Sequence, residues 1–184
     1  MSADQHSSNG TTPRRMQATS LFDTPGMAGA LAGLGGGLAM IVVAAMLSVA
    51  LGYDMWREPR EIAAPIFGLV AANDATAIAV GTLLHFLIAG LLGALFELAL
   101  RRLHLPTDFG VPAVSGLIYG MALWAGAYFM VLPVLNPALM DTYAPSFVIQ
   151  NLVYGVVTGL LYGLLLPAPY IRGSRALAAL AERA

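Results

Sequence analysis

The sequence contains no cysteine and no lysine, and charged residues make up only 10% of its 184 residues. Without cysteine the chain cannot form disulfides, thiolate metal sites, iron–sulfur clusters or a c-type haem attachment. All nine basic residues are arginine, and the net charge of −1 argues against a nucleic-acid partner. The sequence also lacks hydrolase, kinase and nucleotide-binding motifs, so it does not point to an enzyme that acts by itself.

Apolar residues, by contrast, account for 58% of the chain. A bilayer core needs about 20 residues of helix, and in lipid the backbone must satisfy its own hydrogen bonds. The pattern therefore predicts an all-α integral membrane four-helix bundle over residues 26–169, between a polar tail at 1–25 and a second tail at 170–184. The four predicted spans are 22 to 25 residues long: Met27–Leu51, Ala77–Leu100, Gly110–Leu132 and Phe147–Ala168.

The distribution of arginine predicts the orientation of the bundle. Four spans place both ends of the chain on one side of the membrane, and only Arg57 and Arg60 lie on the other side. By the positive-inside rule, we expect a multi-pass protein of the bacterial inner membrane with both termini in the cytoplasm. The seven arginines on the inner side are Arg14, Arg15, Arg101, Arg102, Arg172, Arg175 and Arg183.

Residues 53–76 form the longest predicted connection, on the outer side. We expect Pro59 and Pro65 to break any continuous helix there. The apolar run Ile62–Ala72 is too short to span the membrane, which favours an interfacial or re-entrant segment. At the inner end of the second span, Glu97 and Arg101 stand four residues apart in the favourable order, so we expect them to form an ion pair.

Glycines recur at a spacing of four residues in three of the spans. This spacing places them on one face of each helix, where a neighbouring backbone can approach closely. We expect these faces to hold helices together, either within the chain or between subunits. The predicted packing glycines are Gly29, Gly33, Gly37, Gly116, Gly120, Gly155, Gly159 and Gly163.

The two halves of the chain resemble each other. The residues from Ser115 to Gly120 read SGLIYG, and those from Thr158 to Gly163 read TGLLYG. Such similarity predicts two related helical hairpins in the same orientation, as in transporter repeats or after a simple gene duplication. The alignment of the halves pairs Gly33 with Gly116, Gly37 with Gly120, His85 with Asn151, Gly93 with Gly159 and Phe96 with Tyr162.

His85 is the one ionisable side chain well inside a span, which makes it a functional candidate. Binding of a quinone or a pigment and a proton relay are the functional alternatives, and Asn151 or Gln150 could supply a second polar anchor for a quinone. The packing alternative is a neutral histidine that hydrogen-bonds across the bundle to Asn151. A haem with two histidine ligands is disfavoured, because His104 and His6 lie outside the spans.

Transport is the other functional class. Small four-span multidrug exporters carry a membrane-embedded carboxylate in the first helix, whereas the first span here has no acidic residue. We therefore place a small homo-oligomeric transporter or channel second. The first interpretation is a structural subunit without a cofactor of its own, which contacts lipids and other membrane subunits.

Residues 27–168 resemble a group of uncharacterised four-span, glycine-rich bacterial inner-membrane proteins. The resemblance rests on Leu117-Ile-Tyr-Gly120, Trp124 and Leu132-Pro-Val-Leu-Asn-Pro137. Members of this group are associated with respiratory oxidase genes. The resemblance implies a non-catalytic accessory subunit of a bacterial electron-transfer complex, respiratory rather than photosynthetic, and it carries over no site residues.

Overall fold

The computed structural model describes residues 24–68, 74–105, 110–135, 137, 140 and 144–165, and these residues form helices and turns without a β-strand. The long helices are α1 (Met27–Ala50), α3 (Ala75–Arg102) and α6 (Ala144–Leu165), together with a continuous segment of α4 (Gly110–Gly126), the π-helix η3 (Ala127–Val131) and α5 (Leu132–Leu135). All four are long and apolar enough to cross a membrane, so the chain is a multi-pass, all-α membrane protein. The predicted tails at 1–25 and 170–184 lie almost wholly outside the described residues.

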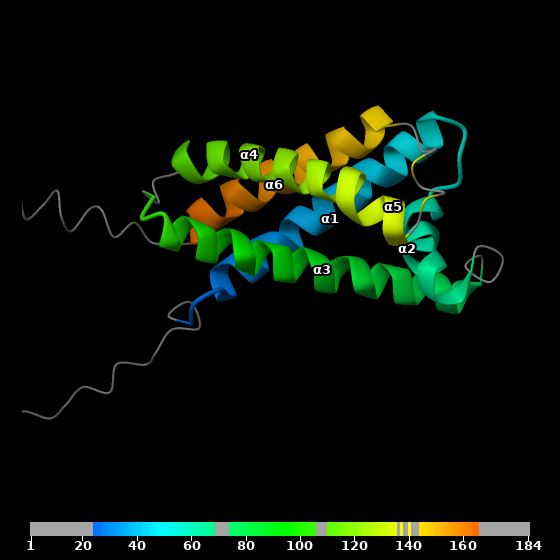
Figure 1. Ribbon diagram of the computed structural model, residues 1–184, viewed down its shortest axis with the longest axis horizontal. Helices are drawn as coiled ribbons and strands as arrows, with labels where there is room; N and C mark the ends of the chain where they lie inside the picture. Colours follow the sequence, from blue (N-terminus) through cyan, green and yellow to red (C-terminus); the bar gives the residue numbers. More distant parts are fainter. Residues whose placement is uncertain are drawn as a thin grey trace, which may run out of the picture.

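The four long helices run side by side along the length of the molecule (Figure 1). A fifth, short helix, α2 (Arg57–Phe67), lies across one end of this bundle, close to the start of α3 and to α5 (Figure 1). We call this end the α2 end. The topology prediction makes it the outer end, whereas α1 begins and α6 ends at the opposite end (Figure 1).

The prediction that Pro59 and Pro65 interrupt any helix was wrong, because α2 runs through both. Pro59 is the third residue of α2, where a backbone N–H has no acceptor within the helix in any case. Pro65 falls in the last turn, and the helix ends at Gly68, which has a positive φ of 80°. The apolar run predicted from Ile62 therefore belongs partly to an amphipathic helix, whose buried residues are Pro59, Ala63 and Ala64.

Glycines join the helices of the first hairpin, α1 and α3. A methyl group at Gly33 would touch the carbonyl oxygen of Ala89 and lie 2.7 Å from the Cα of Gly93. One turn away on either side, Gly29 and Gly37 also face α3. The two backbones are therefore in van der Waals contact, which is the close approach that small residues permit between membrane helices.

The second hairpin, α4 and α6, repeats this packing in the same register. A methyl group at Gly116 would touch the carbonyl oxygen of Gly155 and lie 3.1 Å from the Cα of Gly159. Gly120 similarly faces Asn151 and Gly155. In the alignment of the halves, Gly33 pairs with Gly116 and Gly93 with Gly159, so equivalent residues make equivalent contacts. The eighth predicted packing glycine, Gly163, lies half-buried on α6.

The two contacts between the hairpins differ, however. Helix α1 packs closely along α6, whereas α3 and α4 barely meet. In the close contact between α1 and α6, Gly36 of α1 faces α6. A methyl group at Gly36 would lie 2.8 Å from the carbonyl oxygen of Tyr154. The alignment places Tyr119 of α4 at the position equivalent to Gly36, and its hydroxyl donates a hydrogen bond to the carbonyl oxygen of Leu92 at 2.8 Å. A large side chain thus takes the place of glycine where α4 faces α3, and its hydroxyl bridges the gap between these helices.

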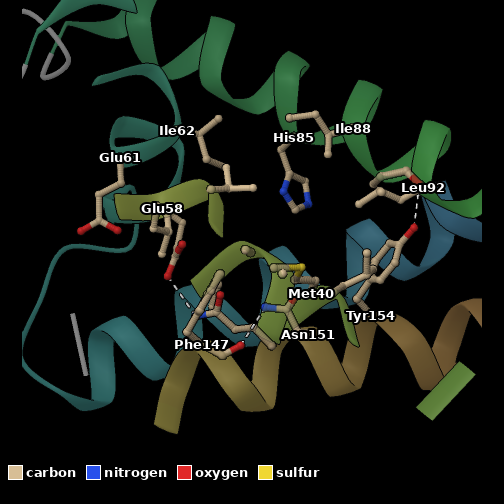
Figure 2. Close-up of a pocket in the computed structure, with 18 of the residues that line it drawn as sticks. Met40, Glu58, Glu61, Ile62, His85, Ile88, Leu92, Phe147, Asn151 and Tyr154 are labelled. Atoms are coloured by element: carbon tan, nitrogen blue, oxygen red, sulfur yellow. Dashed lines mark hydrogen bonds between the residues drawn. The ribbon is translucent and has the colours of Figure 1, made fainter. Parts of the chain in front are cut away.

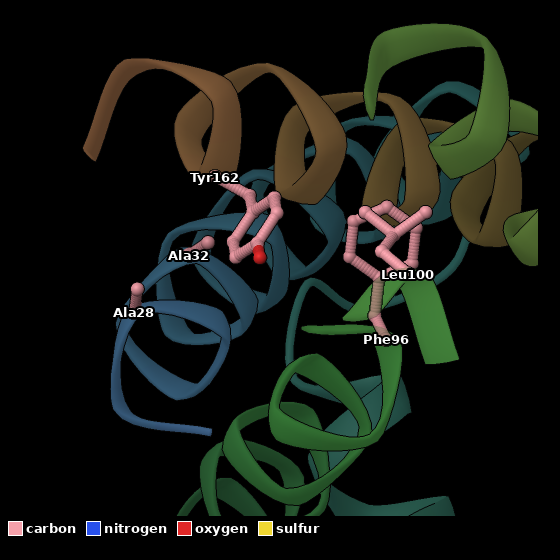
Figure 3. Close-up of a cluster of buried hydrophobic side chains, with 5 residues drawn as sticks. All are labelled: Ala28, Ala32, Phe96, Leu100 and Tyr162. Carbon is pink, nitrogen blue, oxygen red and sulfur yellow. The ribbon is translucent and has the colours of Figure 1, made fainter. Parts of the chain in front are cut away.

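A small apolar core fills the end of the bundle opposite α2 (Figure 3). Phe96 of α3 and Tyr162 of α6 are equivalent in the alignment, and their rings meet edge to face with centroids 5.8 Å apart. Phe96 also contacts the ring of Tyr119 at 5.2 Å. The remaining buried members of this cluster are Ala28, Ala32 and Leu100.

The predicted ion pair between Glu97 and Arg101 is confirmed, with a nitrogen–oxygen distance of 2.6 Å. The side chain of Glu97 is fully buried, and its second oxygen accepts a hydrogen bond from the backbone N–H of Gly29 at 2.6 Å. Gly29 belongs to the first turn of α1, whose amides have no acceptor within the helix. A carboxylate of α3 therefore caps the start of α1.

Candidate functional site

A cavity of about 630 Å³ lies inside the bundle towards the α2 end, and all of the described helices contribute to its wall (Figure 2). Most of the wall is apolar, because α1, α3 and α4 present aliphatic and methionine side chains to it. The polar side chains in the wall are Glu58, Glu61, His85, Gln150, Asn151 and Tyr154.

The cavity reaches the surface of the bundle between α3 and the segment α4–η3–α5. Ile88 of α3 and Met130 of η3 both line the cavity, and they are 50% and 73% exposed, so the wall is open to the surface here. The π-helix η3 falls at this place and supplies Ala127, Met130 and Val131 to the wall. Single π-turns within α-helices occur frequently at functional sites. In a membrane, this opening faces the acyl chains.

A part-buried polar contact joins α6 to α2. Gln150 is only 1% exposed, and its Nε2 donates a hydrogen bond to Oε1 of Glu58 at 2.9 Å. The amide must present its NH₂ to the carboxylate, since an ionised carboxylate can only accept. The other amide atom, Oε1 of Gln150, has no hydrogen-bond partner among the described residues.

His85 lies in the wall as a candidate, but it does not bond to Asn151. Its Nε2 lies 2.9 Å from the carbonyl oxygen of Gly37 on α1, which is accessible because glycine has no side chain. The amide of Asn151 instead donates to the carbonyl oxygen of Phe147 on its own helix at 2.8 Å. His85 therefore hydrogen-bonds across the bundle as predicted, but its partner is Gly37 and not Asn151, although both His85 and Asn151 line one cavity (Figure 2).

Tyr154 closes the cavity on the side away from α2. Its hydroxyl donates a hydrogen bond to the carbonyl oxygen of Ala89 at 2.7 Å, so it ties α6 to α3 beneath the opening. This phenol is almost completely buried. Because the hydroxyl proton is already donated, only the oxygen lone pairs of Tyr154 remain for another partner.

Charges gather where α2 covers the cavity. Arg57 pairs with Glu61 at 2.6 Å and stacks over the ring of Tyr53 at 4.1 Å. Burial raises the pKa of Glu61 above its ordinary value, despite this pairing. On the solvent side, Arg60 pairs with Asp54 at 2.8 Å, and a hydrogen bond from the backbone N–H of Trp56 lowers the pKa of Asp54. These contacts stabilise α2 and the turn before it, whereas the hydrogen bond from Gln150 to Glu58 joins α2 to the bundle.

Sequence reasoning found His85, Asn151 and Gln150 but missed Glu58. Glu58 immediately precedes Pro59, and reading the prolines as helix breakers hid the helix that carries it. The amphipathic pattern of residues over Arg57–Phe67 could have indicated this helix. No three His, Cys, Asp or Glu side chains of the described segments gather into a possible metal site, whereas hydrogen-bonding groups for an organic ligand are present.

Comparisons with known proteins add a family but no activity. No curated protein matches the chain, and no solved structure matches it. One family profile matches residues 24–172, a region that includes all four long helices and the whole of the cavity wall. The chain belongs to DUF6789, a family of unknown function.

Proposed function

We propose that this protein is a non-catalytic accessory subunit of a respiratory electron-transfer complex in the bacterial inner membrane, with both termini in the cytoplasm. The observation that carries this proposal is the one-sided packing of the segment α4–η3–α5. Only 6% of its most apolar stretch is buried within the chain, against 39% for α6. Such a helix offers a long apolar face to neighbouring membrane subunits.

The polar groups inside the bundle also fit a supporting role. His85 and Tyr154 bond to backbone carbonyls of neighbouring helices, and Glu97 caps the first turn of α1. Each of these contacts joins two helices, as expected for groups that stabilise a bundle. The assignment to electron transfer rests on the sequence resemblance, and the role as a subunit rests on the exposed α4 face.

A small homo-oligomeric transporter or channel is the second candidate. The observation that favours it is the cavity itself, which has a carboxylate, Glu58, and an imidazole, His85, in its wall. A transporter of this kind assembles only with copies of itself. A respiratory subunit instead associates with proteins that carry haem.

Purification from native membranes in a mild detergent, followed by an absorption spectrum and native electrophoresis, separates the two candidates. We expect the tagged chain to migrate with a larger complex that shows cytochrome bands. Ile118→Trp on the open α4 face, where Ile118 is 66% exposed, should reduce the amount of cytochrome recovered. Leu87→Trp on α3 is the matched control, because Leu87 is 60% exposed on another helix. A homo-oligomer free of cytochromes would refute the proposal.

A further inference from the structure

The polar end of the cavity presents hydrogen-bond acceptors from two helices. The Glu58 carboxylate on α2 accepts one hydrogen bond from Gln150 and has further lone pairs. Gln150 on α6 is only 1% exposed, and its Oε1 has almost no surface open to the cavity, so this side chain positions the Glu58 carboxylate and does not itself meet a ligand.

His85 on α3 adds a second acceptor. A carbonyl oxygen can only accept, so the contact of His85 Nε2 with the Gly37 carbonyl requires Nε2 to carry the proton. In a neutral imidazole the other ring nitrogen is then an acceptor. The single hydroxyl proton of Tyr154 is already donated to Ala89, and one of the two amide protons of Asn151 is donated to Phe147.

The remainder of the cavity suits an apolar body. Its volume of about 630 Å³ lies within the range of small-molecule sites, roughly 300–1,000 Å³. The opening between Ile88 and Met130 faces the acyl chains, so a ligand enters from the bilayer. A neutral molecule crosses that region at much lower cost than an ammonium ion does.

We propose that this cavity binds a neutral, membrane-soluble molecule whose head donates hydrogen bonds through hydroxyl groups. Hydroquinones and diacylglycerols share this chemistry. The hydroxyls bond to Glu58 and His85, and the apolar body lies along α3 and η3. An oxidised quinone carries only acceptors, so it gains no hydrogen bond from these two acceptors and binds more weakly. The site is independent of the subunit role, because it lies within one chain.

The test uses the full chain in nanodiscs of phosphatidylcholine and measures affinity by calorimetric titration. The probes are a decyl-substituted hydroquinone kept reduced, its oxidised quinone and dioctanoylglycerol. We expect the hydroquinone to bind about five- to tenfold more tightly than the quinone, as the gain of one or two hydrogen bonds implies. Comparison of the hydroquinone with dioctanoylglycerol tells which source of hydroxyls the cavity prefers.

Two variants locate the site. Gln150→Leu should weaken hydroquinone binding about fivefold or more, because the hydrogen bond that positions the Glu58 carboxylate is lost. Thr158→Val, two turns further along α6 and equally buried, should leave binding unchanged. Glu58→Gln introduces an N–H donor in place of an acceptor oxygen, and it should move the preference towards the oxidised quinone. It also serves as the test if Gln150→Leu does not fold.

Three results would overturn the proposal. The first is equal or tighter binding of the oxidised quinone to the unmodified chain. The second is an unchanged affinity and preference in whichever of the two cavity variants folds. The third is the absence of binding for all three probes. Because the isolated chain is titrated, failure here leaves the proposed subunit role untouched, and a failure to find cytochromes leaves this site untouched.

Discussion

Glu97 and Gly29 are 68 residues apart in the sequence, yet the carboxylate accepts a hydrogen bond from the Gly29 amide at 2.6 Å. The first turn of α1 has neither a side-chain cap nor an acidic residue of its own. Glu97 therefore supplies both an acceptor and a negative charge at the positive end of the helix dipole. Its ion pair with Arg101 compensates the buried charge.

At the residue scale, we predict that Glu97→Ala lowers the free energy of unfolding by about 1–3 kcal/mol, because the Gly29 amide loses its acceptor in an apolar setting. Glu97→Gln keeps an acceptor and should cost less. Thermal unfolding in detergent, followed by light scattering, measures both effects. Arg102→Ala is the control, since Arg102 is an exposed charge at the same helix end. Equal melting temperatures for Glu97→Ala and the control would contradict this role.

For His85 we predict a modest effect on the stability of the ligand-free protein. His85→Gln can still donate to the Gly37 carbonyl and should melt near the unmodified protein. His85→Leu loses this hydrogen bond between α3 and α1, at a cost of about 0.5–1.5 kcal/mol. A large loss of stability in His85→Gln would show that the imidazole stabilises the protein through something other than its hydrogen bond to Gly37.

At the scale of the element, glycines on one helix differ sharply in what they touch. A methyl group at Gly93 of α3 would lie 2.6 Å from the Cα of Gly33, which is backbone and cannot move aside. At Gly90, less than one turn earlier, a methyl group would only meet the side chain of Leu34 at 3.4 Å. The same substitution should therefore have opposite consequences at the two positions.

We predict that Gly93→Ala destabilises the protein by about 1–3 kcal/mol through overpacking. Gly90→Ala should be neutral or slightly stabilising, because alanine favours the helix and space is available. Melting temperatures of the two variants in one detergent provide the comparison. Similar values would mean that contact between α1 and α3 does not depend on backbone proximity.

The sequence predicted the membrane helices well, because lipid leaves the backbone few alternatives to a helix over a long apolar run. The glycine faces were also predictable, since a spacing of four residues marks one side of a helix. Helix α2 was missed although its amphipathic pattern was present, because Pro59 and Pro65 indicated breaks, whereas prolines in the first and last turns of a helix cost little. The sequence could not reveal that Gly36 faces α6, because pairing of helices depends on the whole bundle.

The cavity was only partly predictable, because its shape also depends on how the helices pair in the whole bundle. His85 and Asn151 were found because polar groups are rare in spans, and each lies in the cavity wall. The hydrogen-bond partners of His85 and Asn151 were not predicted, because Gly37 and Phe147 contribute backbone carbonyls, which every residue type carries. Tyr119 lies at the gap between α3 and α4. Its importance becomes clear only by comparison with the equivalent residue, Gly36, which packs against α6.

At the scale of the whole molecule, the absence of cysteine makes the orientation simple to test. We predict that a single cysteine at Arg60, in α2, reacts with a membrane-impermeant maleimide in intact cells, because seven of nine arginines lie on the other side. A cysteine at Arg102 should react only after the membrane is permeabilised. The cysteine-free parent is the control, and the reverse pattern would invert the topology.

We also predict that the size of Tyr119 sets the distance between the two hairpins on their open side. Tyr119→Ala should let α3 and α4 approach, whereas Tyr119→Phe retains the ring and should keep the gap. Spin labels on cysteines at Leu95 and Ile118, both exposed side chains, report the separation of the two helices by pulsed electron resonance. An unchanged distance in Tyr119→Ala would show that other side chains hold the gap open.

The two hairpins pack internally in the same way, because equivalent glycines make equivalent contacts in each, yet only one side of the bundle is open. Two identical hairpins related by a twofold axis would form two identical contacts, so a symmetric homodimer would have both sides closed or both sides open. A single chain with two diverged halves is free of this constraint. Here one copy of the position carries Gly36 and the other carries Tyr119, so α1 packs closely on α6 while α3 and α4 barely meet. Two like hairpins within one polypeptide can therefore form one closed and one open seam.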